Sequence, residues 1–318
     1  MGRQTAVVFE GRKIAVVVPA YNESRHIADV IQQMPELVDA IIVVDDCSTD
    51  GTAAVAEAID DGRIHVIRHT RQMGVGGATL TGFRRALEFG ADVAVKVDGD
   101  GQMDPKRIPE LVSPLVREGY HYAKGNRFLH SDALRQMPLP RLLGSFALTF
   151  LTKLASGQWH LFDPQNGYVA VRTDVLGRLH LDEIAQGFFF ENDMLIHLNI
   201  AEARVKDVPI PAIYGDEQSK LRIRRVLLGF PPRLARGLLV RIWRKYVLND
   251  FSPIAVFWLI GIPLLVFGGT FGLGTWAHSL WSGVPASTGT VMLSVLPFLL
   301  GFELMLQAII LEIQETRR

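Results

Sequence analysis

The sequence contains one cysteine, Cys47, among its 318 residues. A disulfide within the chain is therefore excluded, and the composition suits a reducing compartment. No charged start followed by an apolar core precedes Ile14, which argues against a cleaved signal peptide. The nine histidines show none of the spacings of zinc ligands, so we expect no zinc site. Net charge is also lacking, because 33 basic residues balance 33 acidic ones.

Two long stretches lack charge almost completely. Residues 251–277 contain no Lys, Arg, Asp or Glu, and residues 291–311 contain only Glu303. Each exceeds the roughly 20 residues that span a bilayer as a helix. We predict a transmembrane hairpin in residues 251–318, with spans at about 253–276 and 290–311. Two buried core helices are the less favoured alternative. Glu303 is expected either at a helix–helix or oligomer contact or near one end of its span.

Basic residues flank this hairpin on one side only. Residues 226–250 form a basic, amphipathic juxtamembrane segment, Arg317 and Arg318 follow the second span, and residues 278–289 contain no Lys or Arg. The distribution predicts an integral membrane protein with both termini and the preceding domain in the cytoplasm. A bacterial inner membrane is the favoured location. We expect the basic segment to lie on anionic lipid, and nucleic acid is not an expected partner.

The first 225 residues have the pattern of one α/β domain. Apolar, β-branched runs at 14–19, 40–44, 64–68 and 91–97 alternate with helical patterns at 27–37, from 52, at 74–89 and at 105–118. Shorter strand patterns follow at 121–127, 169–172 and 205–210. This alternation predicts a mostly parallel, Rossmann-like sheet, which binds ligands beyond the carboxyl ends of its strands.

Polar residues follow three of these strands directly. Residues 21–23 read Tyr-Asn-Glu, residues 45–46 read Asp-Asp, and residues 98–102 read Asp-Gly-Asp-Gly-Gln. Closely spaced carboxylates at a strand end suit Mg²⁺ or Mn²⁺ held against a phosphate-bearing ligand. A solvated turn is the simpler interpretation of the last motif alone. The shared edge favours a ligand site.

Three motifs in register resemble the signatures of family-2 inverting glycosyltransferases with the GT-A fold. They are Val-Pro-Ala-Tyr-Asn-Glu at 18–23, Val-Asp-Asp-Cys-Ser-Thr-Asp-Gly-Thr at 44–52, and Asp-Gly-Asp-Gly-Gln-Met-Asp-Pro at 98–105. The nearest subgroup is the polyprenyl-phosphate glycosyltransferases, which includes dolichol-phosphate mannose synthase and bacterial relatives with two membrane spans. The resemblance covers residues 13–222 and the architecture of the tail. It implies transfer of one sugar from a nucleotide diphosphate sugar to polyprenyl phosphate, with inversion.

The resemblance also implies a donor site. Its residues would be Pro19, Tyr21, Asn22, Glu23, Val44, Asp46, Val97, Asp98, Gly99, Lys220 and Arg222. Asp46 would bind the base and Asp45 would shape the turn. The Mg²⁺ or Mn²⁺ ligands would be Asp98, Asp100 and Gln102. Relatives often carry an arginine shortly before the Ser-Lys-Leu turn at 219–221. This chain lacks it, and Arg222 or Arg224 is expected to substitute.

Catalytic roles are implied for Asp100, Arg127, Asp163 and Glu191. The acceptor phosphate would meet Arg127, Arg141 and Ser145, although Arg141 is equally well explained as a surface charge. Asp163 is a candidate general base, but a lipid phosphate is already ionised near neutral pH, so we expect it to position rather than abstract a proton. Glu191 and Asp193 open a helix, where the helix dipole alone also favours acids.

Several alternatives remain at this stage. A polysaccharide synthase would extend a glycan, but such enzymes usually carry Gln-x-x-Arg-Trp and more spans. A non-catalytic membrane adaptor would be expected to have a broken metal motif, and this motif is intact. UDP is favoured over GDP as the donor nucleotide. A homo-oligomer is left open.

Overall fold

The computed structural model describes residues 11–127, 139–211 and 223–316, with the backbone alone for 139–143, 223–228 and 316. The chain divides into two compact units, Met1–Leu238 and Leu239–Arg318. The three-part division at residues 225 and 250 that the sequence suggests stays a prediction.

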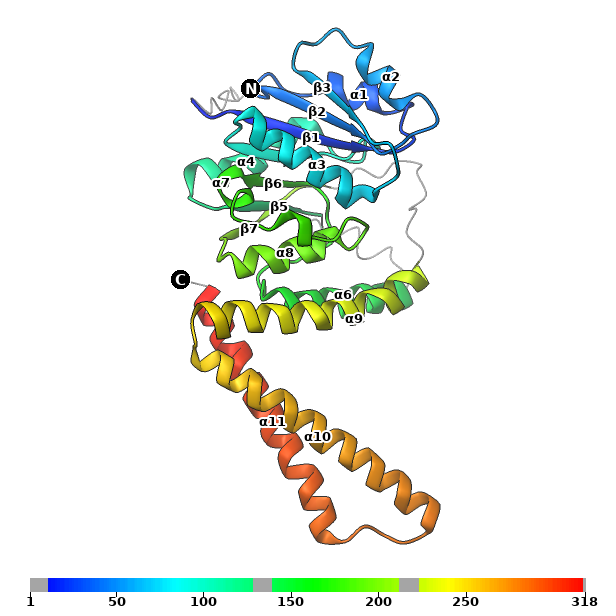
Figure 1. Cartoon of the computed structure of the whole chain (residues 1–318), viewed down its shortest axis with the longest axis vertical. Coiled ribbons are helices and arrows are strands. Elements are labelled where there is room, and N and C mark those ends of the chain that lie inside the picture. Colours follow the sequence, from blue (N-terminus) through cyan, green and yellow to red (C-terminus); the bar gives the residue numbers. More distant parts are fainter. Residues whose placement is uncertain (1–10, 128–138, 212–222, 317–318) are drawn as a thin grey trace. The chain divides into compact units, whose positions relative to one another are not determined.

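A seven-stranded sheet forms the centre of the first unit (Figure 1), in the order β3-β2-β1-β4-β6-β5-β7. Its strands are β1 (Ile14–Ala20), β2 (Ala40–Asp45), β3 (Ile64–Arg68), β4 (Val93–Lys96), β5 (Tyr122–Asn126), β6 (Val169–Arg172) and β7 (Val205–Pro209). The strands β1 to β4 are parallel to one another, and β5 is parallel to β7. Only β6 runs against its neighbours β4 and β5. The predicted mostly parallel sheet is confirmed.

Helices cover both faces of this sheet, because successive strand side chains point to opposite sides. Val16 and Val18 of β1 pack with α1 (Ile27–Gln32), α2 (Thr52–Glu57) and α4 (Ile108–Arg117). Val17 packs on the opposite face, with α3 (Gly74–Phe89), α7 (Thr173–Leu176) and α8 (Phe190–Ile200). Helix α1 is shorter than the predicted 27–37. Pro35 disfavours helical backbone in the residue before it, so the helix stops early.

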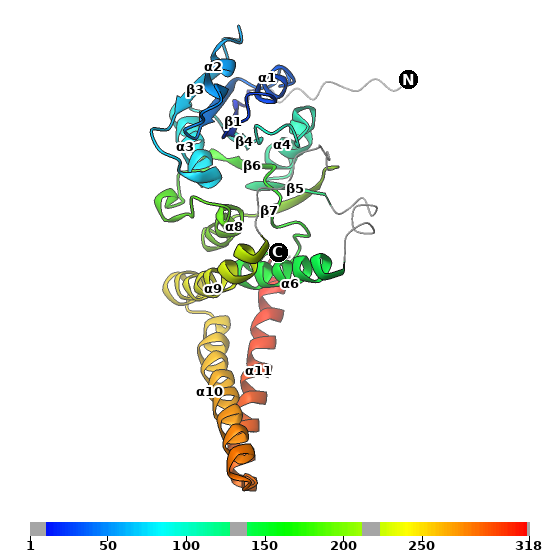
Figure 2. The same cartoon turned by 90° about the vertical axis from the view of Figure 1, so that its right-hand side faces the viewer.

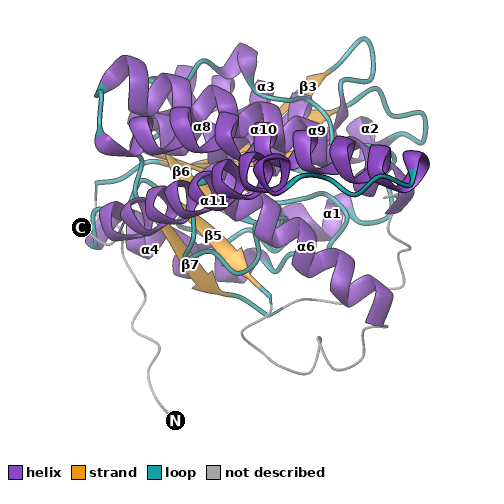
Figure 3. Cartoon of the chain, turned by 90° about the horizontal axis from the view of Figure 1, so that it is seen from below, coloured by secondary structure: helices purple, strands orange, loops and turns teal. Residues whose placement is uncertain are grey.

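An outer helical layer covers α8. Helices α6 (Leu139–Ser156) and α9 (Ile223–Arg241) lie side by side in both views (Figures 1 and 2). Phe189, at the start of α8, meets Phe230 of α9 edge-on with ring centroids 5.1 Å apart. Ala155 of α6 and Leu234 of α9 join the same apolar cluster. Strands β5 to β7, orange in Figure 3, therefore lie within a multilayered unit.

The second unit contains two long apolar helices. They are α10 (Pro253–Ser282) and α11 (Thr288–Thr316), preceded by a π-helical turn over Ile242–Asn249. Their apolar windows have mean hydropathies of 2.2 and 2.0. The helices approach closely at Gly268, where an added Cβ would lie 2.5 Å from the Phe298 backbone nitrogen. Small residues permit such contacts between membrane helices. The predicted spans fall within these two helices.

The outer faces of these helices are apolar and exposed. Val266, Leu296 and Leu299 are each more than half exposed. Soluble proteins rarely expose such a continuous apolar surface. The two helices are long and apolar enough to cross a membrane, and 28% and 11% of their most apolar windows are buried, which is little for core helices. Glu303 lies on an exposed face of α11, where it accepts a hydrogen bond from Gln307 at 2.9 Å.

Candidate functional site

The carboxyl ends of β1, β2 and β4 meet at one edge of the sheet, because these strands are parallel neighbours. Asp45 ends β2, and Asp98 comes two residues after β4. The Asp46 backbone nitrogen donates to Ala20 O at 2.8 Å, which joins the ends of β2 and β1. Buried predicted donor-site residues at this edge are Pro19, Glu23, Val44, Asp46, Val97 and Gly99. The structure therefore brings the three motifs together.

Two loops at this edge are joined by side-chain hydrogen bonds. The Asn22 nitrogen donates to Ser48 Oγ at 2.9 Å, and the Ser24 nitrogen donates to Asp50 Oδ2 at 3.0 Å. Burial opposes ionisation of Asp50, but hydrogen bonds from Thr52 and Ser24 lower its pKa to about 2. Asn22 adopts φ +56°, a left-handed conformation that asparagine tolerates. Tyr21, next to it, remains 37% exposed and faces solvent.

Asp46 makes three hydrogen-bonding contacts within the protein. Its Oδ1 lies 2.7 Å from His69 Nδ1 and accepts from the Met73 nitrogen at 2.8 Å. Its Oδ2 accepts from the Gly74 nitrogen at 2.7 Å. By contrast, Asp45 Oδ1 is buried and has no hydrogen-bond partner. A buried acceptor without a donor costs free energy. Asp45 Oδ1 is therefore an acceptor at this edge without a protein donor.

The motif after β4 offers oxygen ligands for a divalent cation. Asp98 keeps 26% of its side-chain surface exposed. Asp100 Oδ1 accepts from the Gln102 backbone nitrogen at 3.0 Å, and the Gln102 side chain is exposed. Within the described residues, no group of three or more His, Cys, Asp or Glu side chains could hold a metal. Two carboxylates and an amide fit Mg²⁺ or Mn²⁺ only as part of a shell that water and phosphate complete.

A lysine is buried directly beneath this motif. Lys96 ends β4 with its side chain 1% exposed, and its Nζ lies 2.6 Å from Asp98 Oδ1 and 3.6 Å from Glu191 Oε1. It also donates to Gly167 O at 3.2 Å. Burial lowers the pKa of Lys96, but the charges of Asp98 and Glu191 outweigh burial, and the pKa is raised above its usual value. Lys96 is therefore held as an ammonium.

A second buried lysine lies at the same level of the sheet. Lys96 and Lys124 are both in register with Val169 of β6. Lys124 Nζ donates to Asn166 O. Burial lowers the pKa of Lys124 to about 8, while Glu191 and other nearby carboxylates oppose that shift. The two lysines together hold consecutive carbonyls of the loop that enters β6.

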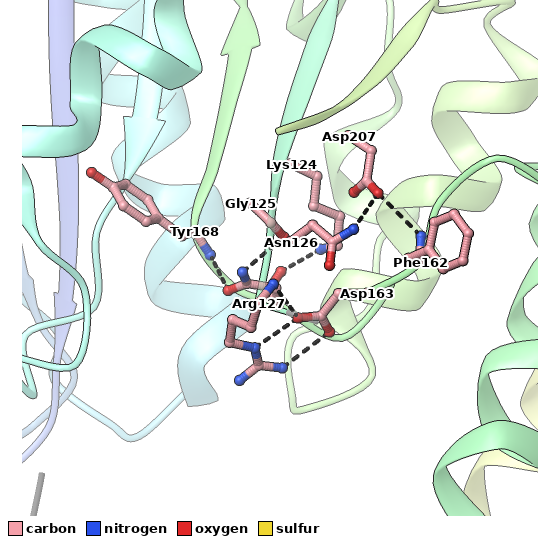
Figure 4. Close-up of polar contacts among 9 residues, drawn as sticks. Lys124, Gly125, Asn126, Arg127, Phe162, Asp163, Tyr168 and Asp207 are labelled. Atoms are coloured by element: carbon pink, nitrogen blue, oxygen red, sulfur yellow. Dashed lines mark hydrogen bonds and ion pairs between the residues drawn. The ribbon is translucent and has the colours of Figure 1, made fainter. Parts of the chain in front are cut away.

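That loop, residues 163–168, is also fixed by an arginine (Figure 4). Arg127 Nε donates to Asp163 Oδ2 at 2.7 Å and Nη2 donates to Oδ1 at 3.0 Å. Asp163 is fully buried, whereas Arg127 is 41% exposed. Asn166 Nδ2 adds a bond to Gly125 O at 2.8 Å. The bidentate pair orients the guanidinium toward solvent, and Asp163 is engaged in that pairing.

The two acids of α8 occupy different environments. Glu191 is 12% exposed and lies beside Lys96. Burial raises the pKa of Asp193, and its Oδ2 accepts from the Ala185 nitrogen at 2.8 Å. Asp193 therefore fixes the segment before α8, whereas Glu191 belongs with Asp98 and Lys96.

Some predicted residues lie outside what the structure describes. Lys220 and Arg222 fall in the segment 212–222, and the side chain of Arg141 in α6 is also outside. Ser145 is described and is half-buried on α6.

Sequence reasoning missed Lys96, Lys124 and His69. A signal for the two lysines was present, because each interrupts an otherwise apolar or small-residue strand, Val-Ala-Val-Lys and Tyr-Ala-Lys-Gly. A charge at an inward strand position has to find buried partners. His69 follows β3 and offered no comparable signal. Its partners, Asp46 and Thr81, come from distant segments.

The chain is similar to several known proteins. The family model described as glycosyl transferase family 2 matches residues 15–179. The UDP-N-acetylglucosamine–dolichyl-phosphate N-acetylglucosaminyltransferase of Methanococcus voltae is 32% identical over 232 residues, which cover 68% of this chain and 92% of that protein. The undecaprenyl-phosphate mannosyltransferase of Micrococcus luteus is 32% identical over 203 residues, covering 62% and 82%.

A solved structure shares the fold. The glucosyl-3-phosphoglycerate synthase of Mycobacterium tuberculosis, crystallised with Mn²⁺, uridine diphosphate and its glucosylated product, superposes with a TM-score of 0.53 and 25% identity. The alignment covers 73% of this chain and 80% of that one. The likeness identifies the first unit as a GT-A-like fold.

Proposed function

The chain belongs to glycosyl transferase family 2, and we propose that it transfers one sugar from a nucleotide diphosphate sugar to polyprenyl phosphate at the cytoplasmic face of a membrane. The observation that carries this proposal is the presence, in one chain, of an acidic strand edge and two long apolar helices with exposed outer faces. The first suits a nucleotide diphosphate and the second suits a lipid-borne acceptor. The names of the relatives, which act on dolichyl and undecaprenyl phosphates, support the same acceptor class.

The donor nucleotide is assigned to the loops after β1 and β2. Tyr21 is exposed enough to stack on a base, and Glu23, two residues later, is buried. Asp45 is the proposed acceptor for the base N–H, since its Oδ1 has no partner, while Asp46 fixes the loop at Met73. UDP is favoured over GDP. Two similar proteins are named or crystallised with uridine nucleotides, which supports that choice.

The donor diphosphate is assigned to the edge at Asp98 and Asp100, with Gln102 beside them. These residues would hold Mg²⁺ or Mn²⁺, which would stabilise the charge of the departing diphosphate as a Lewis acid. Lys220 and Arg222 are proposed as further diphosphate contacts from outside the described residues. Glu191, held beside Lys96, is proposed to accept hydrogen bonds from sugar hydroxyls.

The acceptor phosphate is assigned to Arg127, with Arg141 and Ser145 of α6. Asp163 holds the Arg127 guanidinium in a fixed plane, and a planar fork suits phosphate oxygens. The phosphate oxygen forms a bond to the anomeric carbon as the bond from that carbon to the nucleotide diphosphate breaks on the opposite side. Because the phosphate is already ionised, no side chain has to remove a proton.

The membrane arrangement is proposed from charge. The basic residues before α10 and the absence of Lys or Arg in residues 278–289 favour both termini in the cytoplasm. A bacterial inner membrane is the proposed location. The exposed Glu303–Gln307 pair is costly in lipid, which supports association of copies through α11.

A transfer assay with the full chain tests this function. Radiolabelled UDP- and GDP-sugars would be offered with polyprenyl phosphate and Mg²⁺ or Mn²⁺, and label would be followed into the organic phase. We expect lipid-linked label with one UDP-sugar, and none for Asp100→Ala, which should still insert into membranes. Full activity of that variant, or label that accumulates only in polymer, would contradict the proposal.

A further inference from the structure

Lys96 connects three segments that line the proposed site. Its ammonium meets Asp98 Oδ1 at 2.6 Å, Gly167 O at 3.2 Å and Glu191 Oε1 at 3.6 Å. The contact to Gly167 O is a hydrogen bond, and those to the two carboxylates are ion pairs. The three partners come from the motif after β4, from the loop that enters β6, and from α8. Lys96 therefore fixes the relative positions of all three.

The charges around this ammonium nearly cancel. Asp98 and Glu191 are ion-pair partners of Lys96, and Asp100 follows Asp98 in the same motif. Lys124 is a second cation within reach of Glu191. Three carboxylates and two ammoniums leave one net negative charge at the place where a divalent cation would bind. A single net charge, with no group of three ligating His, Cys, Asp or Glu side chains among the described residues, is a poor site for a bare cation.

We propose that Lys96 is a positioning residue that also acts as the resident counter-cation of Asp98, so that a divalent ion binds well only together with a nucleotide diphosphate. The ammonium holds one oxygen of Asp98 and offsets its charge. A diphosphate supplies the missing negative charge and further oxygen ligands. Cation and nucleotide thus bind with positive coupling, which by linkage is the same from either side. This inference rests on the proposed function, because it takes the edge at Asp98 as the diphosphate site.

Lys124 provides a matched control. It is equally buried, lies at the same sheet level and bonds to the same loop. It binds the Asn166 carbonyl, whereas the ammonium beside Asp98 belongs to Lys96. Removing either charge should disturb the loop, but only removal of Lys96 releases Asp98.

The experiment measures Mn²⁺ binding by the purified full chain in detergent, using the electron spin resonance signal of free Mn²⁺, with and without UDP. For the wild type we expect weak binding of Mn²⁺ alone and at least about 10-fold tightening by UDP. Lys96→Gln, which keeps a hydrogen-bond donor, should bind Mn²⁺ alone at least about 10-fold more tightly and show reduced coupling. Lys124→Gln removes a charge that bonds to Asn166 O rather than to Asp98, and should tighten Mn²⁺ binding by clearly less than Lys96→Gln does.

Two results would overturn the inference. One is a folded Lys96→Gln protein whose affinity for Mn²⁺ alone is unchanged or lower, or is matched by Lys124→Gln. The other needs no variant: a wild type that binds Mn²⁺ equally well with and without UDP has no coupling for Lys96 to provide. Thermal unfolding checks that each variant is folded.

The measurement separates this inference from the proposed function. If the wild type transfers sugar but Lys96→Gln leaves Mn²⁺ binding unchanged, the function stands and the role of Lys96 fails. If no donor and lipid pair yields product but the coupling changes as expected, the role stands and the acceptor assignment fails.

Discussion

Arg241 and Glu312 form a buried, two-point ion pair. Nη1 and Nη2 of the arginine lie 3.1 and 3.2 Å from the two carboxylate oxygens, and the side chains are 0% and 1% exposed. Trp258 Nε1 donates to the same carboxylate at 3.0 Å. The pair ties the end of α9 to α11, and the tryptophan adds α10. Removing one member of such a pair leaves a buried charge without its counter-charge.

Arg241→Met should therefore destabilise the second unit by about 3–5 kcal/mol. The double variant Arg241→Met/Glu312→Gln should recover a large part of that loss, because no isolated charge remains. Thermal unfolding in detergent, followed by the fluorescence of Trp258 and its neighbours, measures both. If Glu312→Gln is measured as well, a double variant whose loss equals the sum of the two single losses would show that the charges are independent.

Substitution of Asp45 should affect nucleotide binding, whereas substitution of Asp46 should affect stability. Asp45→Asn should weaken UDP binding by about 10-fold or more at nearly unchanged melting temperature, since it removes a charged acceptor from a ligand. Asp46→Asn should lower the melting temperature, because the amide keeps one acceptor oxygen and the Met73 and Gly74 nitrogens use two. Calorimetric titration and thermal unfolding distinguish them. The reverse pattern would return base binding to Asp46.

Substitutions at the Arg127–Asp163 pair test whether a general base is needed. Asp163→Asn keeps the shape of the side chain and one acceptor for Arg127. Its kcat should fall by less than the roughly 100-fold that removal of a general base costs. Arg127→Lys cannot form the bidentate pair. It should lower kcat/KM for polyprenyl phosphate, while the KM for the sugar donor should change by a smaller factor. Initial rates with each substrate varied measure the split. A loss of 10⁴-fold in Asp163→Asn, with a lost acidic limb in the pH profile, would restore the general base.

Lys124 should make stability depend on pH in the alkaline range. Its pKa is about 8 in the folded protein, below the 10.5 of an exposed lysine. Between these values the unfolded chain binds more protons than the folded one, so stability rises with pH. The unfolding free energy of the wild type minus that of Lys124→Met should therefore increase from about pH 8 to about pH 10. If this difference in unfolding free energy stays constant or falls over this range, the pKa of Lys124 is not lowered by burial.

The fold was largely predictable from local pattern. Strands β1 and β2 are continuous β-branched runs, and the polar residues after them mark the ligand edge, because parallel strands place their carboxyl ends together. The partners of charged groups were not predictable. Asp46 meets His69, Lys96 meets Glu191, and Arg241 meets Glu312, each across many residues of sequence.

The partners of the basic residues in the juxtamembrane segment were also not predictable from the sequence. The basic pattern predicts that the whole segment lies on lipid head groups. Arg241 and Lys245 instead pair with Glu312 and Glu315 of α11, at 3.1 and 3.5 Å. Amphipathic spacing identifies which side of a helix is basic, but not which of those charges a neighbouring helix will neutralise.

The shared register of Lys96 and Lys124 with Val169 has a consequence for how the strands find their alignment during folding. A slip of one residue in β4 would turn Lys96 to the opposite face, among the aliphatic side chains of α1 and α4, away from Asp98, Gly167 and Glu191. An ammonium stranded there would cost several kcal/mol. Alternating valines and alanines would tolerate such a slip far better. The two lysines thus exclude misaligned sheets, and the charge that serves the site also selects the native pairing.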